Sequence, residues 1–305
     1  MPVPPITEQA NVNSREIDTL TTGEVLTIMN TEDSKVAPAV SLEIPHIARA
    51  VDLMVEAIQR GGRVFLIGAG SSGRLAALDA AECPPTFNVS PEQIQAVIAG
   101  GERSLVHAQE AVEDDSAAGW RDLQQRSFGP KDVLVCVSAG GYSEYVLAAG
   151  RAARAIGAAV LGLTCNKDSP LAAVADCLIA PDTGSEVIAG STRLKAGTAT
   201  KLVLNMLSTA TMVRLGYVYR NLMVNVHPTN RKLKERAKRI VSEVVEVDLE
   251  RADELLSAGG SVRTAIVMGL LGVDRAEAER RLDESGGRIS AVIGRSGARG
   301  EGMVA

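Results

Sequence analysis

Residues 63–74 read RVFLIGAGSSGR, an apolar run that passes directly into a glycine-rich turn carrying two hydroxyls. The run is short and lacks polar alternation, which is typical of a strand buried on both faces of a parallel sheet. Four more runs of this kind follow it in the chain. We therefore expect a doubly wound α/β fold, with a mostly parallel sheet of about five strands flanked by helices. The predicted strands are Arg63 to Ile67, Gln95 to Ile98, Val133 to Val137, Ala159 to Thr164 and Cys177 to Ala180.

Helical patterns connect several of these strands, at Arg74 to Ala81, Ser104 to Glu113 and Ser143 to Ile156. Beyond Arg239, apolar residues recur at helical spacing between glycine pairs, which indicates a small helical bundle. We expect three parts: an amino-terminal arm with short helices at 1–45, the α/β domain at 46–240, and a small helical domain with a flexible tail at 241–305.

The charge balance excludes some classes of partner. Among the 305 residues, 32 Lys and Arg face 37 Asp and Glu, a net charge of −5. No global field attracts nucleic acid or an anionic membrane surface, and we expect neither as a partner. The most apolar long segment, Leu194 to Leu215, contains Lys195, Lys201 and Arg214, so it is expected to be a buried core helix.

The four cysteines, Cys83, Cys136, Cys165 and Cys177, show no C-x-x-C pairing. Reduced thiols and a cytoplasmic protein are the simplest expectation. The amino-terminal thirty residues contain several acidic side chains and no basic start before an apolar stretch, so we do not expect a secretory signal there.

The glycine-rich turn is the first candidate binding element. Glycines let backbone amides approach an anion, and Ser71 and Ser72 stand at the start of the following helix. The spacing of Gly68, Gly70 and Gly73 also matches the dinucleotide fingerprint, but the next predicted strand ends without the acidic residue that would hold a ribose. A single phosphate on a sugar is favoured over a dinucleotide, and the dinucleotide remains the alternative.

Two carboxylates are candidate acid/base groups. Glu82 precedes Pro84 and Pro85, which are expected to end the helix there. Glu113 is expected at the carboxyl end of the 104–113 helix, where negative charge opposes the helix dipole. On residue patterns alone, a solvated carboxylate is the favoured interpretation of both residues. Cys83 lacks an evident His partner, so packing is the better interpretation of that thiol.

Two further loops carry polar side chains that could converge on the same ligand. Ser138 and Ser143 flank a second glycine turn after the third predicted strand. Glu186 and Ser191 precede the long apolar helix, where Ser191 and Thr192 could instead cap the helix.

Together these segments resemble the sugar isomerase domain and, more narrowly, the N-acetylmuramic acid 6-phosphate etherase family. The resemblance runs from about Ile17 to Ala291. It is carried by GAGSSGRL from Gly68, DAAECPPT from Asp79, IAGG from Ile98, GSTRLKAGTA from Gly190, KLVLNMLST from Lys201 and NLMV from Asn221. The ECPP and KAGTA stretches are the specific ones.

The resemblance implies that Glu82 and Glu113 occupy the two catalytic positions of a lyase that removes D-lactate from N-acetylmuramic acid 6-phosphate, with Ser71, Ser72, Ser138, Ser143, Glu186 and Ser191 near the substrate. It implies a homodimer and no cofactor, and the chain offers no cluster of residues with metal-ligand spacing. An aldose–ketose phosphate isomerase and a non-catalytic sugar-phosphate-binding regulator stay open as alternatives.

One loop departs from the family pattern. Where etherases typically have ASGRTPY, residues 139–145 read AGGYSEY. A hydroxyl and a cation are lost, and Glu144 adds negative charge near the expected phosphate. Each lost charge-assisted hydrogen bond weakens binding by about 1.5–3 kcal/mol, and an altered substrate preference is therefore a hypothesis for this chain.

Overall fold

The computed structural model describes residues 4–109, 111–226 and 231–297, with the backbone alone described for 295–297. The flexible tail expected at the carboxyl end lies largely outside the described residues. Two compact units divide the chain: 1–82 with 90–208, and 83–89 with 209–305. The three-part division expected from the sequence remains a prediction.

Five parallel strands form the sheet of the first unit, in the order β2-β1-β3-β4-β5. Their bounds confirm the predicted strands: β1 Val64–Gly68, β2 Ile94–Ile98, β3 Val133–Val137, β4 Ala159–Leu163 and β5 Cys177–Ile179. The strand order reverses between β1 and β3. In such sheets, ligands bind beyond the carboxyl ends of the strands at the point of reversal.

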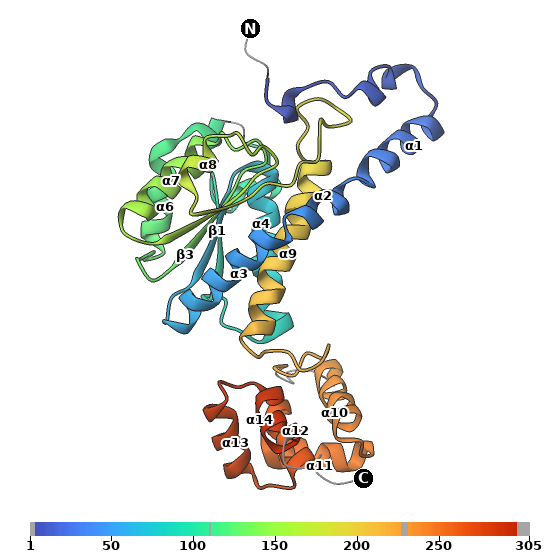
Figure 1. Ribbon diagram of the computed structural model, residues 1–305, viewed down its shortest axis with the longest axis vertical. Coiled ribbons are helices and arrows are strands. Elements are labelled where there is room, and N and C mark those ends of the chain that lie inside the picture. The colour runs from blue at the N-terminus through green and yellow to red at the C-terminus, as the bar shows by residue number, and fades with distance from the viewer. Residues whose placement is uncertain (1–3, 110, 227–230, 298–305) are drawn as a thin grey trace, which may run out of the picture. The chain divides into compact units, whose positions relative to one another are not determined.

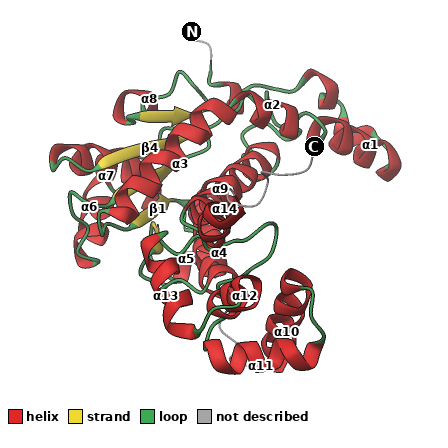
Figure 2. Cartoon of the chain, turned by 60° about the horizontal axis from the view of Figure 1, so that its bottom comes forward, coloured by secondary structure: helices red, strands yellow, loops and turns green. Residues whose placement is uncertain are grey.

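Helices cover both faces of this sheet, as expected for a doubly wound fold (Figures 1 and 2). On one side lie α6 (Ser116–Gln125), α7 (Glu144–Ala155) and α8 (Leu171–Val174). On the other lie α3 (Ile44–Gln59), α4 (Gly70–Phe87) and α9 (Lys195–Arg214). β1 and β3 are buried at every position, which explains why their sequences lack polar alternation.

Short helices precede α3 at the amino-terminal end of the chain. Three 3₁₀ turns, η1 (Ile6–Glu8), η2 (Val12–Ser14) and η3 (Ile17–Thr19), precede α1 (Thr22–Asp33) and α2 (Val36–Leu42). Thr21 and Glu24 form a reciprocal capping box at the start of α1.

Two helix predictions are wrong. Pro84 and Pro85 do not end α4, which continues to Phe87. The carbonyl of Pro84 accepts a hydrogen bond from the amide of Asn88 at 2.8 Å, and Phe87 is buried, so packing of the last turn outweighs the cost of about 3 kcal/mol for an interior proline. The predicted 104–113 helix is broken into α5 (Arg103–Val106) and the 3₁₀ helix η4 (Ala111–Asp114).

The second unit is a helical bundle, again as predicted. It contains α10 (Arg231–Val245), α11 (Leu249–Gly259), α12 (Val262–Leu271), α13 (Arg275–Glu284) and α14 (Ile289–Gly297). Asp248, Ser261 and Asp274 cap the starts of α11, α12 and α13 through their side chains, which satisfies amides that have no partner within the helix.

No single helix among the described residues is long and apolar enough to cross a membrane. The neighbours α11 and α12 meet that criterion only as a pair, and the chain bends by 114° between them.

Candidate active site

The glycine-rich turn joins β1 to α4 at the carboxyl end of the sheet. A Cβ added at Gly68 would lie 2.7 Å from the amide nitrogen of Gly73, and one added at Gly73 would lie 2.6 Å from Cγ1 of Ile98. Both positions therefore need glycine because the turn, the helix and β2 approach closely. Ser71 and Ser72 are half-buried in the first turn of α4, where backbone amides have no helical acceptor. This arrangement suits a phosphate group.

The second loop, after β3, lies at the same edge of the sheet. Ser138 is buried, and its hydroxyl accepts a hydrogen bond from the amide of Gly141 at 3.2 Å. Gly141 has a φ of 78°, and a Cβ there would lie 2.1 Å from the buried hydroxyl of Ser169, so no other residue fits this turn. Gly141 corresponds to the glycine of the ASGRTPY pattern, whereas the extra glycine of this loop is Gly140, where an added Cβ would meet only ordinary contacts at 3.7 Å or more.

The charge of Glu144 in this loop is paired. Its carboxylate lies 2.7 Å from Nη2 of Arg151, two helical turns further along α7, and both side chains are about half-exposed. The sequence could not show this ion pair. It reduces the negative charge that Glu144 presents to an anionic ligand.

Glu113 lies beside this loop. The hydroxyl of Ser143 donates to the backbone carbonyl of Glu113 at 3.1 Å. Glu113 is part of η4 and is exposed. The expectation that it opposes the dipole of a long helix is wrong because that helix does not exist. The hydrogen bond from Ser143 instead places Glu113 beside the second loop, at the carboxyl end of the sheet.

Glu82 lies elsewhere within the same chain. It is eleven residues after Ser71 on the continuous helix α4, which corresponds to about 16 Å along the axis at 1.5 Å per residue. Its side chain is exposed. A single chain therefore does not bring Glu82 to the glycine-rich turn. Leu78, one helical turn earlier on the same face, is 49% exposed, so an apolar surface adjoins the carboxylate.

Glu186 is fully buried and binds the backbone at the start of α9. Its two carboxylate oxygens accept hydrogen bonds from the amides of Lys195 and Ala196, at 3.0 and 2.9 Å. Burial raises the pKa of Glu186, although these two hydrogen bonds oppose the shift. The anion-binding start of α9 is thus occupied by a side chain of the protein itself, and both carboxylate oxygens of Glu186 are engaged by backbone amides of α9. Ser191, by contrast, is only half-buried.

A buried ion pair joins this region to the arm, and the sequence analysis did not identify it. Nζ of Lys195 lies 2.6 Å from Oε2 of Glu32, and both side chains are at most 2% exposed. The sequence draws attention to Lys195, since this charged residue begins the most apolar helix of the chain. Nothing in the sequence draws attention to Glu32, because its partner is 163 residues away.

Among the described residues, no group of three or more His, Cys, Asp or Glu side chains could hold a metal ion.

The fold and the two serine-bearing loops define a sugar isomerase (SIS) domain protein. Residues 111–210 match the SIS domain model, and residues 46–153 match the model of the glucokinase regulatory protein N-terminal SIS domain. Solved structures of this fold include phosphoheptose isomerase from Neisseria gonorrhoeae, with a TM-score of 0.50 and 21% identity over 63% of this chain and 98% of that one.

The chain belongs to the N-acetylmuramic acid 6-phosphate etherase family. It is 50% identical to the family member from Aeromonas hydrophila, covering 93% of this chain and 96% of that protein. It is 48% identical to the one from Photorhabdus laumondii, covering 94% and 96% of the two chains. Its identity to the protein from Deinococcus radiodurans is 46%, over 96% of this chain and 97% of the relative.

Proposed function

We propose that this chain is an etherase that converts N-acetylmuramic acid 6-phosphate to N-acetylglucosamine 6-phosphate and D-lactate. The observation that carries this proposal is the near-complete alignment with etherases at 48–50% identity. The position of Glu113 beside the Ser143 loop supports it, because a carboxylate there can act on a sugar whose phosphate is held by the neighbouring loops.

The proposed reaction is an elimination followed by an addition. In the open-chain sugar, the aldehyde at C1 acidifies the proton at C2, and one carboxylate removes it as a base. The C3–O bond then breaks, and a carboxylic acid donates a proton to the departing lactate oxygen. Water adds across the C2–C3 double bond, placing hydroxyl on C3 and a proton on C2. Glu82 and Glu113 are proposed as this acid/base pair.

Ser71, Ser72, Ser138, Ser143 and Ser191 are proposed as the hydroxyls nearest the sugar phosphate. Glu186 is better explained as the residue that shapes the Ser191 segment. The altered 139–145 loop has a hydroxyl at Ser143 and follows directly on Ser138, and the Glu144–Arg151 ion pair limits the added negative charge. An altered substrate preference remains our hypothesis for this loop.

A D-lactate assay in ¹⁸O-labelled water tests the function. We expect equimolar D-lactate and N-acetylglucosamine 6-phosphate, with the label on the C3 hydroxyl and none in lactate, because the C3–O bond is the one that breaks. The unphosphorylated sugar should react at least about 100-fold less efficiently, since its charge-assisted hydrogen bonds are missing. Binding of the phosphosugar without lactate release would instead support a sugar-phosphate regulator, and a product of unchanged mass would support an isomerase.

We also propose that the protein works as a homodimer in the cytoplasm, with Glu82 of one chain completing the site of the other. The separation of about 16 Å between Ser71 and Glu82 within one chain supports this. So does the apolar surface of Leu78 and Met206, which are 49% and 38% exposed. A twofold axis would place the same patch of each chain against its copy.

Mixing two inactive variants tests the shared site. Glu82→Gln and Glu113→Gln chains, unfolded and refolded together, should recover about one quarter of wild-type activity, because half of the dimers are mixed and each mixed dimer has one intact site. No recovery above the sum of the two variants would contradict a site shared between chains. Sedimentation measures the oligomeric state of the protein, and cell fractionation measures its cellular location.

A further inference from the structure

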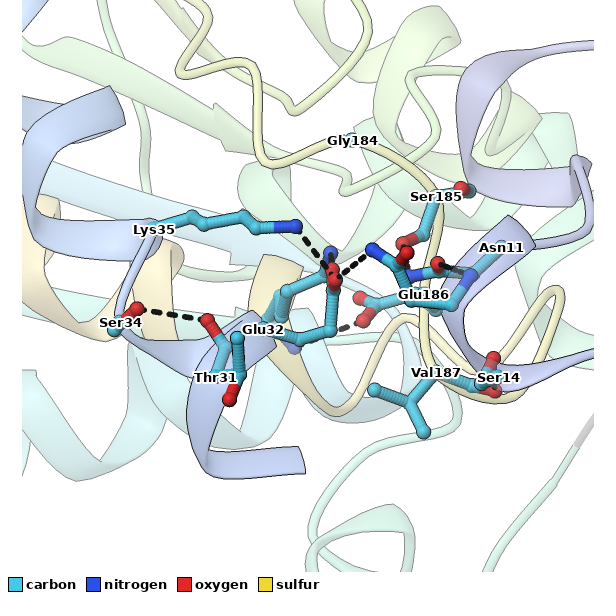
Figure 3. Close-up of polar contacts among 12 residues, drawn as sticks. Asn11, Ser14, Thr31, Glu32, Ser34, Lys35, Gly184, Ser185, Glu186 and Val187 are labelled. Atoms are coloured by element: carbon cyan, nitrogen blue, oxygen red, sulfur yellow. Dashed lines mark hydrogen bonds and ion pairs between the residues drawn. The ribbon is translucent and has the colours of Figure 1, made fainter. Parts of the chain in front are cut away.

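The arm, residues 4–43, contacts the segment 184–195 through residues 7–14 and through Glu32. The amide of Gly190 donates to the carbonyl of Thr7 at 2.9 Å. The side chain of Asn11 donates to the carbonyl of Ser185 at 3.0 Å, and the hydroxyl of Ser14 donates to that of Val187 at 2.7 Å (Figure 3). Backbone groups that have no partner in a helix or strand here are satisfied by the arm.

Glu32 joins these contacts to the start of α9. It accepts hydrogen bonds from Lys195 at 2.6 Å, from Lys35 at 2.5 Å and from Asn13 at 2.9 Å. Burial alone would raise the pKa of Glu32, but these hydrogen bonds hold it well below its ordinary value, so the carboxylate stays charged. Lys195 is in turn fixed through its amide by Glu186. Two buried carboxylates therefore clamp one residue, Lys195, from the arm and from the loop.

The clamped segment ends, at the start of α9, level with the glycine-rich turn. Ser208 donates to Oδ1 of Asp79 at 3.1 Å, and the amide of Asn205, with its nitrogen facing Asp79, adds a second contact at 3.2 Å. Asp79 is nine residues into α4 and Asn205 is ten residues into α9. Both helices begin at the carboxyl edge of the sheet. Because Asp79 and Asn205 are in contact and are almost equally far from the starts of their helices, the two starts lie at a similar height above the sheet edge. Ser71 is at the start of α4, and Ser191 lies just before the start of α9.

We propose that the arm is a working part of the substrate site, and that Glu32 and Lys195 are positioning residues that hold the 184–195 segment so that Ser191 faces the sugar phosphate. The inference rests on the proposed function for its ligand and on the contacts above for its geometry. Both charges of a buried ion pair are satisfied in only one arrangement of the two side chains. We therefore expect the Glu32–Lys195 pair to select one conformation of the 184–195 segment more than to add to the free energy of folding.

The test compares three full-length variants by hydrogen–deuterium exchange and by calorimetric binding of N-acetylglucosamine 6-phosphate. Glu32→Gln should raise exchange in 184–195 about tenfold and weaken binding about tenfold, because Lys195 loses its charged partner. Asn11→Ala should act in the same direction because the hydrogen bond to Ser185 is lost, while Glu32 and Lys195 both keep their charges. Exchange in Val133–Val137 should remain unchanged in both if the sheet stays folded.

Lys35→Ala is the matched control. It removes another cation from the same carboxylate, but Lys35 is 50% exposed and its ion pair with Glu32 lies within the arm. Exchange and binding should stay within about twofold of wild type. In turnover assays, Glu32→Gln should raise KM more than it lowers kcat, since it holds the binding loop and touches no reacting atom.

Two results would overturn the inference: no change of exchange in 184–195 when Glu32 or Asn11 is replaced, or increased exchange with unchanged affinity for the sugar phosphate. If wild-type protein binds the sugar phosphate but releases no D-lactate, the proposed reaction fails and the arm proposal is still decided by exchange and affinity. If wild-type protein binds no sugar phosphate, the ligand assignment of both proposals fails.

Discussion

Replacing Glu82 with glutamine lowers kcat for D-lactate release by about 10²–10⁴-fold while leaving the affinity for N-acetylglucosamine 6-phosphate near that of wild type. Glutamine keeps the size of the side chain and its hydrogen-bonding capacity, but it cannot carry a proton between C2 or the lactate oxygen and water. The expected loss is the usual contribution of one general acid or base. Because Glu82 is exposed at the surface of α4, the substitution leaves the fold intact.

Glu113→Gln should give a loss of the same order, and Asp114→Asn is its matched control. Asp114 is the next residue of the same 3₁₀ helix and is also exposed. The assays are initial rates of D-lactate release and calorimetric binding of the product. An activity loss for Asp114→Asn as large as that for Glu113→Gln would show that general disturbance of η4, and not proton transfer, explains the result.

Asp79→Asn should make the α/β unit more stable near neutral pH. It should also make the free energy of unfolding less dependent on pH between about pH 4 and pH 6. Burial raises the pKa of Asp79 from 3.8 to about 6, although the hydrogen bond from Ser208 and the charge of Lys201 oppose the shift. The folded protein therefore holds this proton more tightly than the unfolded chain does. Its stability falls as pH rises through this window, by at most about 3 kcal/mol from this group, and the penalty is constant above it.

The measurement is urea unfolding at several pH values, followed by the fluorescence of Trp120. This residue is the only tryptophan of the chain and lies in α6, so it reports on the α/β unit without interference from the helical unit. Glu56→Gln, a carboxylate exposed on α3, serves as the control. Parallel pH profiles for wild type and Asp79→Asn would contradict the prediction.

Local patterns in the sequence predicted the sheet well, for a physical reason. Each strand of a parallel sheet covered on both faces must be apolar along its whole length, so Val64–Gly68 and Val133–Val137 stand out without knowledge of their neighbours. Glycines at close backbone approaches mark the loops between them in the same way.

Local rules failed where packing overrode them. Pro84 and Pro85 satisfy every rule for a helix end, yet α4 continues because Phe87 is buried and its carbonyl accepts a hydrogen bond from Asn225 at 2.6 Å. The prediction of a 104–113 helix is wrong in the opposite way, because a helix was expected to continue where the chain ends it. The helical pattern is present, but the carbonyls of Leu105 and His107 accept hydrogen bonds from Arg74, and the chain leaves the helix at His107.

For the site, the sequence alone determined which residue types are present and, through resemblance, which two carboxylates to test. Tertiary structure alone decided where they stand: Glu113 beside Ser143, Glu82 about 16 Å along α4 from Ser71, and Glu186 buried against the start of α9. It alone also paired Glu32 with Lys195. Residues 163 positions apart leave no periodic trace in a sequence, because their contact depends on how the whole chain closes.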